Sequence, residues 1–139
     1  LLGLATPTAL ALHWGVMALC ALSVVLFWRS ERIGFDAKVA MLMIAILLSA
    51  PYLWYYEAAM MAAIGLFMAR AGILTPRLPH ACLLVLLWIG AGLQSANIFV
   101  DFAEDRYLGA VIVTPVLGVA FVLCWLHAIS TRHSAAKTA

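Results

Sequence analysis

Long apolar runs, separated by short polar stretches, occupy most of this 139-residue chain. Each run is close to the roughly 20 residues that an α-helix needs to cross a bilayer. The first run follows Thr6 and Pro7, which suit the N-cap and the first turn of a helix. We expect residues 131–139 to form a frayed polar tail. The pattern predicts one all-α transmembrane domain over residues 1–139, with spans at residues 9–28, 36–53, 56–74, 81–100 and 108–129.

The boundary between the second and third spans needs a separate argument. Residues 39–69 form a run of 31 mostly apolar residues, which fits either one long helix or two shorter ones. Pro51 lacks a backbone N–H and clashes with the preceding turn, and Glu57 is costly in the middle of a membrane. The tyrosines and the tryptophan between them are typical of a membrane interface. We therefore predict a turn at residues 51–57.

The basic residues sort to one side of the membrane when the chain turns at this point. Seven of the eight then share a side, and only Arg106 lies on the other, whereas a single long helix divides them four and four. Because cytoplasmic loops carry an excess of Lys and Arg, the amino end is predicted to be outside and the carboxyl end cytoplasmic. The seven residues are Arg29, Arg32, Lys38, Arg70, Arg77, Arg132 and Lys137.

The composition agrees with a membrane protein. Hydrophobic residues make up 67% of the chain and charged residues 10%, whereas soluble domains have about 25% charged residues. The formal net charge of +2 gives no indication of a nucleic-acid surface. Residues 1–8 lack the pattern of a signal peptide, and we expect the chain to be the carboxyl-terminal part of a larger membrane enzyme. Cys20, Cys82 and Cys124 lack the spacing of a disulfide framework or zinc site and are expected to pack as small apolar residues.

Several polar residues are candidates for a site in the outer half of the membrane. Gln94, Asn97 and Asp101 share one helix face, where they either bond to other helices, at about 0.6 kcal/mol each, or bind a ligand. Glu57 is either a functional carboxylate or a solvated group that the helix dipole stabilises. Arg106 is either an ion-pair partner of a nearby aspartate or a clamp on a lipid-linked phosphate.

Aromatic and histidine residues allow further interpretations. Tyr52 and Tyr56 belong to a cluster that fits an interface belt and also fits a platform for sugar rings or isoprenoid chains. His80 and His127 fall near the cytoplasmic ends of their spans, so a haem held between them is a distant alternative. We expect no cofactor and no metal ion.

The chain has the stretch LLGLATPTALAL, a span that ends in Trp-Arg, and the stretch LLSAPYLWYYEAAMM. Through these features, and most specifically through the last, the segment 2–89 resembles the carboxyl-terminal part of glycosyltransferase family 87. The members of this family are bacterial membrane mannosyltransferases that use polyprenyl-phosphate sugars as donors. Pro51, Tyr52 and Tyr56 stand at positions of the family's motif, whereas Glu57 replaces its usual aspartate.

This resemblance implies an active site outside the cytoplasm, which is where the charge sorting also puts the motif. The expected function is part of a glycosyltransferase that moves a hexose, with mannose as the family's sugar, from a polyprenyl-phosphate carrier to an extracytoplasmic acceptor. The family's catalytic acid lies near the amino terminus, so the catalytic residues are expected outside this chain. The expected substrate-binding residues are Tyr52, Tyr56, Glu57, Asn97, Asp101 and Arg106.

The expected location is the bacterial plasma membrane, where the chain crosses several times. The expected partners are membrane lipid, the polyprenyl-phosphate sugar and the amino-terminal helices of the same protein, with no nucleic acid. The alternative is a noncatalytic helical subunit or scaffold of a membrane complex, in which the polar groups of the spans satisfy one another.

Overall fold

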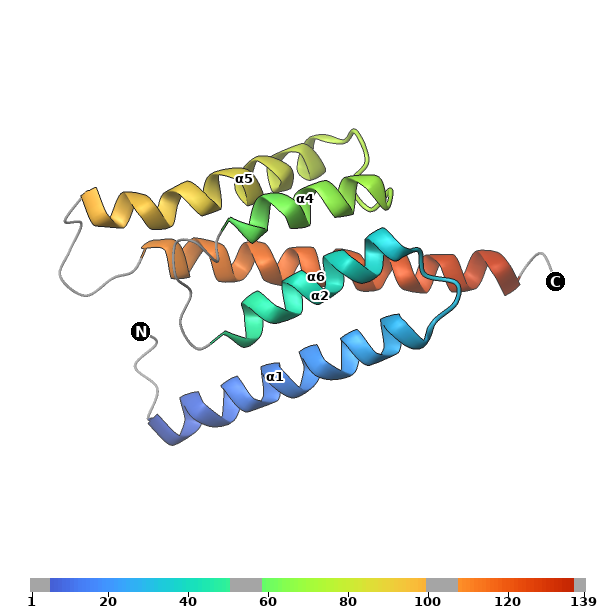
Figure 1. The fold of residues 1–139 in the computed structure, drawn as a ribbon, viewed down its shortest axis with the longest axis horizontal. Helices are drawn as coiled ribbons and strands as arrows, with labels where there is room; N and C mark the ends of the chain where they lie inside the picture. The colour runs from blue at the N-terminus through green and yellow to red at the C-terminus, as the bar shows by residue number, and fades with distance from the viewer. Residues whose placement is uncertain (1–5, 51–58, 100–107, 137–139) are drawn as a thin grey trace.

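A computed structural model describes residues 6–50, 59–99 and 108–136 of the chain (Figure 1). These residues form five α-helices, which confirms the predicted all-α fold. Leucine and alanine, two strong helix formers, recur through all of them. The helices are α1 (Thr6–Arg29), α2 (Phe35–Ser49), α4 (Met60–Arg70), α5 (Leu78–Phe99) and α6 (Leu108–Ala136).

Successive helices run in opposite directions and lie roughly side by side (Figure 1). Short turns at residues 30–34 and 71–77 connect α1 to α2 and α4 to α5 at one end of the molecule. The carboxyl end of α6 points toward this end as well. The opposite end holds the last residues of α2 and α5 and the first residues of α4 and α6.

Helix α2 is the centre of the bundle, because it packs against α1, α4 and α6. Helices α4 and α5 pack on each other, and α5 packs on α6. Met41 and Ile44 of α2 are fully buried and share one hydrophobic cluster with Ile64 of α4, Leu87 of α5 and Leu117 of α6. The core therefore draws side chains from the short central helix α2 and from three of the helices that surround it.

Two glycines let α4 and α5 approach closely. A Cβ atom on Gly65 of α4 would lie 2.8 Å from Leu84 Cδ1 of α5, closer than real Cβ contacts. A Cβ atom on Gly90 of α5 would lie 2.7 Å from Met61 Cε of α4. Small residues of this kind are the usual means by which helices pack tightly in membranes.

Helix α1 lies at the edge of the bundle and is buried along a narrow stripe formed by Cys20, Ser23 and Phe27. The Ser23 hydroxyl donates to the carbonyl of Leu19 at 2.7 Å and accepts a bond from Trp125 Nε1 at 3.1 Å. The rings of Phe27 and Trp125 meet edge to face, with centroids 5.3 Å apart. One hydrogen bond and one ring pair therefore connect α1 directly to α6.

The rest of α1 presents apolar side chains outward. Leu12, Trp14, Leu19 and Leu22 are each more than half exposed. Two of the described helical segments, Thr6–Arg29 and Ile112–Thr131, are long and apolar enough to cross a membrane. Because little of α1 is buried, its apolar surface is not explained by a place in a protein core. These features indicate membrane association.

Several helix boundaries differ from the prediction by a few residues. The described part of helix α1 begins at Thr6, which is itself helical and is therefore not the N-cap that was predicted. Helix α2 ends at Ser49, before the predicted boundary at residue 53, and the predicted turn at residues 51–57 lies outside the described residues. Helix α5 begins at Leu78 and has Pro79 in its first turn, where a proline costs no intrahelical hydrogen bond.

Helix α4 ends at Arg70, four residues earlier than predicted, because of a glycine turn. Gly72 has φ of +72°, a conformation that glycine adopts without steric cost. The N–H of Ile73 bonds to the carbonyl of Met68, and the N–H of Gly72 bonds to that of Ala69. This pair of bonds is the Schellman motif that ends many helices.

Helix α6 is longer than predicted, and the expectation of a frayed tail after residue 130 is wrong for residues 131–136. The helix continues to Ala136 without interruption at Pro115. No glycine or proline follows Ile129, and the side chains of Ser130 and Thr131 bond back to the carbonyls of His127 and Ala128. Hydroxyls that bond in this way are compatible with a continuing helix.

Candidate functional site

Most of the predicted substrate-binding residues lie outside the described part of the chain. Tyr52, Tyr56 and Glu57 belong to the segment 51–58, and Asp101 and Arg106 belong to the segment 100–107, whose structure is not described. Asn97 lies in the last turn of α5, and its side chain is also outside the description.

The ends of the helices nevertheless limit where these two segments join the bundle. Helix α2 ends at Ser49 and α4 begins at Met60, and both of these helix ends lie at the same end of the molecule (Figure 1). Helix α5 ends at Phe99 and α6 begins at Leu108, also at this end. The segments that hold the predicted site residues are therefore connected to one common end of the bundle.

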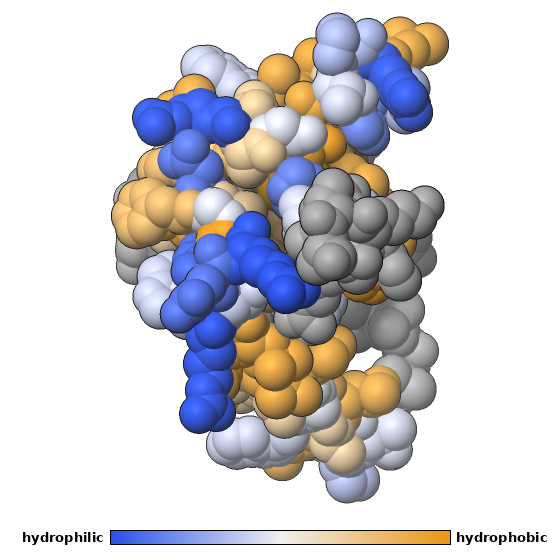
Figure 2. Space-filling model, turned by 90° about the vertical axis from the view of Figure 1, so that its right-hand side faces the viewer, coloured by the Kyte–Doolittle hydropathy of each residue, from blue (hydrophilic) through white to orange (hydrophobic). Residues whose placement is uncertain are grey.

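The opposite end, which we call the basic end, carries most of the described positive charge. It consists of the turns 30–34 and 71–77 with the helix ends that flank them. Figure 2 looks at the molecule from this side and shows hydrophilic side chains spread over an apolar body. The described basic residues here are Arg29, Arg32, Lys38, Arg70 and Arg77.

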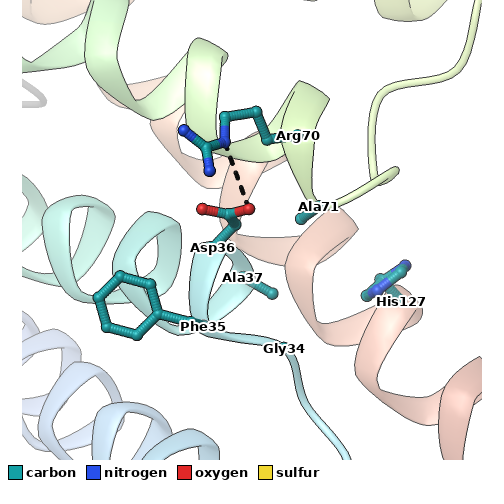
Figure 3. A pocket seen from close by; sticks show the side chains of 7 residues that line it. All are labelled: Gly34, Phe35, Asp36, Ala37, Arg70, Ala71 and His127. Atoms are coloured by element: carbon teal, nitrogen blue, oxygen red, sulfur yellow. Dashed lines mark ion pairs between the residues drawn. The ribbon is translucent and has the colours of Figure 1, made fainter.

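A hollow of about 390 Å³ opens at the basic end between α2, α4 and α6. Asp36, in the first turn of α2, and Arg70, the last residue of α4, form an ion pair at 3.4 Å between Oδ2 and Nε (Figure 3). His127 of α6 lines the same hollow, together with Gly34 and Ala71. We call this feature the Asp36–Arg70 hollow.

The sequence prediction did not single out this ion pair, although a signal was present. Asp36 and Arg70 are 34 positions apart, so no local spacing connects them. The predicted alternation of spans, however, puts the start of the second span and the end of the third on one side of the membrane. An acid at the first position and a base at the second are then candidates for an ion pair.

The two histidines considered for haem have different surroundings. The Nδ1 atom of His80 accepts a hydrogen bond from the N–H of Thr75 at 2.9 Å, and the Thr75 hydroxyl lies 2.9 Å from the same atom. His127 lines the Asp36–Arg70 hollow. Among the described residues, no group of three or more His, Cys, Asp or Glu side chains is arranged to hold a metal ion.

The cysteines follow the prediction in part. Cys20 and Cys124 are buried in the helix interfaces, as expected of small apolar packing residues. Cys82 is exposed on α5, so the expectation is wrong for this residue. Position 82 faces away from the core because the buried positions on this part of α5 are Leu83 and Leu87.

No protein-family model, curated protein or solved structure matches the chain. The fold and surface define an all-helical protein whose two long apolar helices indicate membrane association.

Proposed function

We propose that the chain is a multi-pass membrane protein with five spans, its basic end in the cytoplasm and its amino end outside. The alternating helix directions support this proposal, because they put five of the eight basic residues at one end (Figure 1). An excess of Lys and Arg is the usual mark of the cytoplasmic side.

The lengths of α2 and α4 are compatible with spans when their neighbours are considered. At 1.5 Å per residue, the 15 residues of α2 and the 11 of α4 cover about 22 Å and 16 Å, less than the roughly 30 Å of a bilayer core. Helix α2 packs against three other helices and α4 against two, with six residues of α2 and four of α4 buried. A helix shielded by protein can be shorter than one that faces lipid, because its ends need not meet the membrane surface.

Within this arrangement, we propose that the chain is part of a glycosyltransferase. It transfers a hexose, with mannose as the first candidate, from a polyprenyl-phosphate carrier to an extracytoplasmic acceptor. The observation that carries the proposal is the motif at residues 51–57, which resembles that of glycosyltransferase family 87. Its support from the fold is that the segments 51–58 and 100–107 join the bundle at the end opposite the basic one.

Each predicted residue has a role that its chemistry suits. Tyrosine rings offer flat apolar surfaces to a sugar or an isoprenoid chain, and a carboxylate accepts bonds from sugar hydroxyls. Arginine binds a phosphate through two parallel N–H donors. The proposed substrate-binding residues are Tyr52, Tyr56, Glu57, Asn97, Asp101 and Arg106, and the catalytic base is proposed to come from outside this chain.

The orientation is tested by labelling thiols in intact cells. In a background without the exposed Cys82, Tyr55→Cys is expected to react with a membrane-impermeant maleimide, whereas Arg32→Cys is expected to react only after the cells are opened. Both positions lie beside apolar runs, so the pair controls for general accessibility. The reverse pattern would show that the basic end is outside and would remove the proposed extracytoplasmic site.

The role of Glu57 is tested by Glu57→Gln, which keeps the size of the side chain and removes its charge. We expect the rate of mannose transfer from polyprenyl-phosphate mannose by the full-length protein to fall about tenfold, the effect of losing one charged hydrogen bond. Glu31→Gln is the matched control, because Glu31 is an exposed acid at the basic end and its loss leaves the rate unchanged. Equal rates for both variants at equal expression would exclude Glu57 from the site.

A noncatalytic subunit is the second candidate, and one observation favours it. Among the described residues, Ser23 is the buried polar side chain, and it is satisfied by bonds to Leu19 and Trp125. The described interior thus resembles a structural bundle in which polar groups bond to one another. Absence of transfer activity in the full-length protein, together with migration as a complex of fixed larger mass, would favour this candidate.

A further inference from the structure

We propose that the Asp36–Arg70 hollow binds the phosphodiester headgroup of an anionic phospholipid. The proposal rests on the membrane location proposed above, but it concerns the opposite end of the molecule from the sugar-transfer motif. It does not depend on the identity of the reaction.

The charge of the basic end fits such a ligand. Its described side chains include five Lys or Arg residues and two acids, Glu31 and Asp36, which leaves an excess of three positive charges. Clusters of basic residues next to membrane helices attract anionic lipids, and basic pockets between such helices bind their headgroups.

The hollow also lies at the level where a headgroup would be found. Trp28 and Phe35 are exposed beside the turn 30–34, at 45% and 71% of their surface. Exposed aromatic side chains next to basic residues are typical of the membrane–water interface. Phe35 is among the residues that line the hollow, and its ring extends from α2 on the side away from His127 (Figure 3).

Arg70 is the group best suited to hold the phosphate. Its side chain is 63% exposed, and its contact with Asp36 is made through Nε. Because a guanidinium carries five N–H donors, this contact leaves a forked set that fits two phosphate oxygens. The Asp36 carboxylate contacts the guanidinium on one side, as Figure 3 shows.

Two further features add to the site. Helix α2 begins at the hollow, its N-cap is Gly34, and no side chain caps it. The first N–H groups of a helix and the positive end of its dipole favour an anion nearby. His127 approaches from α6, and the volume of about 390 Å³ falls in the range of about 300–1,000 Å³ typical of ligand sites.

The test is a lipid titration of the purified full-length protein in mixed micelles. Binding is measured as the rise in the protein's thermal unfolding temperature as lipid is added. Dioleoyl-phosphatidylglycerol is expected to bind about tenfold more tightly than dioleoyl-phosphatidylcholine. Arg70→Gln is expected to weaken phosphatidylglycerol binding about fivefold, the effect of losing one direct hydrogen-bonded contact with the phosphate. Arg77→Gln is the matched control, because it removes the same charge from the same end without lining the hollow. Salt screens an exposed charge that makes no contact with the ligand, so its effect is expected to stay below about twofold.

Asp36→Asn separates ligand binding from a structural role of the ion pair. It breaks the same contact as Arg70→Gln but removes a negative charge from the hollow, so phosphatidylglycerol is expected to bind more tightly. Weaker binding in both variants would overturn the proposal, because the pair would then be a structural link alone. An equal loss of phosphatidylglycerol binding in Arg77→Gln would also overturn the proposal. The lipid would then be attracted by the charge of the whole basic end and not held in the hollow.

Soluble phosphate is the other source of the same chemistry. If sn-glycerol 3-phosphate raises the unfolding temperature as much as the lipid does, the hollow serves a soluble anion and the lipid proposal fails. Binding in micelles requires neither sugar transfer nor a particular orientation in cells. The proposed function can therefore fail while lipid binding is observed, and the reverse also holds.

Discussion

Replacing Phe27 with alanine is expected to lower the free energy of unfolding by about 3 kcal/mol, the low end of the range for a buried aromatic side chain. Phe27 is 1% exposed and meets the ring of Trp125 edge to face. Its loss leaves a cavity between α1 and the rest of the bundle. In a membrane the driving force is packing and not transfer from water, so the lost van der Waals contacts account for most of the effect. Equilibrium unfolding in mixed micelles with increasing dodecyl sulfate measures it.

Trp28→Ala is the control for this prediction. Trp28 follows Phe27 in the chain, is similarly large, and has 45% of its surface exposed. Its replacement is expected to change the free energy of unfolding by about 0.5 kcal/mol or less. If both variants lose the same amount, α1 does not dock through the stripe of Cys20, Ser23 and Phe27.

Gly90→Leu is expected to lower the free energy of unfolding by about 2 kcal/mol, within the range for overpacked cores. The first added carbon would meet Met61 Cε at 2.7 Å and Met61 Sδ at 3.0 Å, and Val113 lies just beyond. Met61 is fully buried, so its side chain has little space into which it can move. Helices α4 and α5 must then separate or rotate. The same unfolding assay detects the loss.

Gly92→Leu provides a matched comparison on the same helix. A Cβ atom at Gly92 has no neighbour within 4 Å among the described atoms. Both substitutions replace glycine by a good helix former, which by itself stabilises a helix by up to about 0.8 kcal/mol. The difference between them isolates the cost of packing. Gly90→Leu unfolding at the same dodecyl sulfate concentration as Gly92→Leu would contradict the close approach of α4 to α5.

The number, type and order of the described helices could be predicted from the sequence because the apolar runs are long, although the run 39–69 had to be divided by the proline and the charge sorting. The residues at which the helices end were harder to predict. Gly72 was a readable stop signal for α4, and the absence of any glycine or proline after Ile129 was a readable sign that α6 continues. Which helix lies in the centre was not readable, because an apolar face looks the same whether protein or lipid covers it.

The candidate sites divide in a similar way. The sequence motif pointed to residues 51–57 through a resemblance, which needs no knowledge of packing. The pairing of Asp36 with Arg70 and that of Ser23 with Trp125 depend on how distant helices meet. Such pairs can be found from sequence only after the topology is known. Even then, each polar residue has several possible partners at the same depth of the bundle.

The hydrogen bond between Ser23 and Trp125 has a consequence for biogenesis, because it joins residues 102 positions apart. Helices leave the ribosome in chain order, so α1 is made long before its partner on α6 exists. The Ser23 hydroxyl can meanwhile bond to the carbonyl of Leu19 within its own helix, so α1 does not expose an unsatisfied hydroxyl to lipid. Docking of α1 against α6 is thus postponed until α6 is synthesised, and a chain stalled before Trp125 leaves α1 attached mainly through α2.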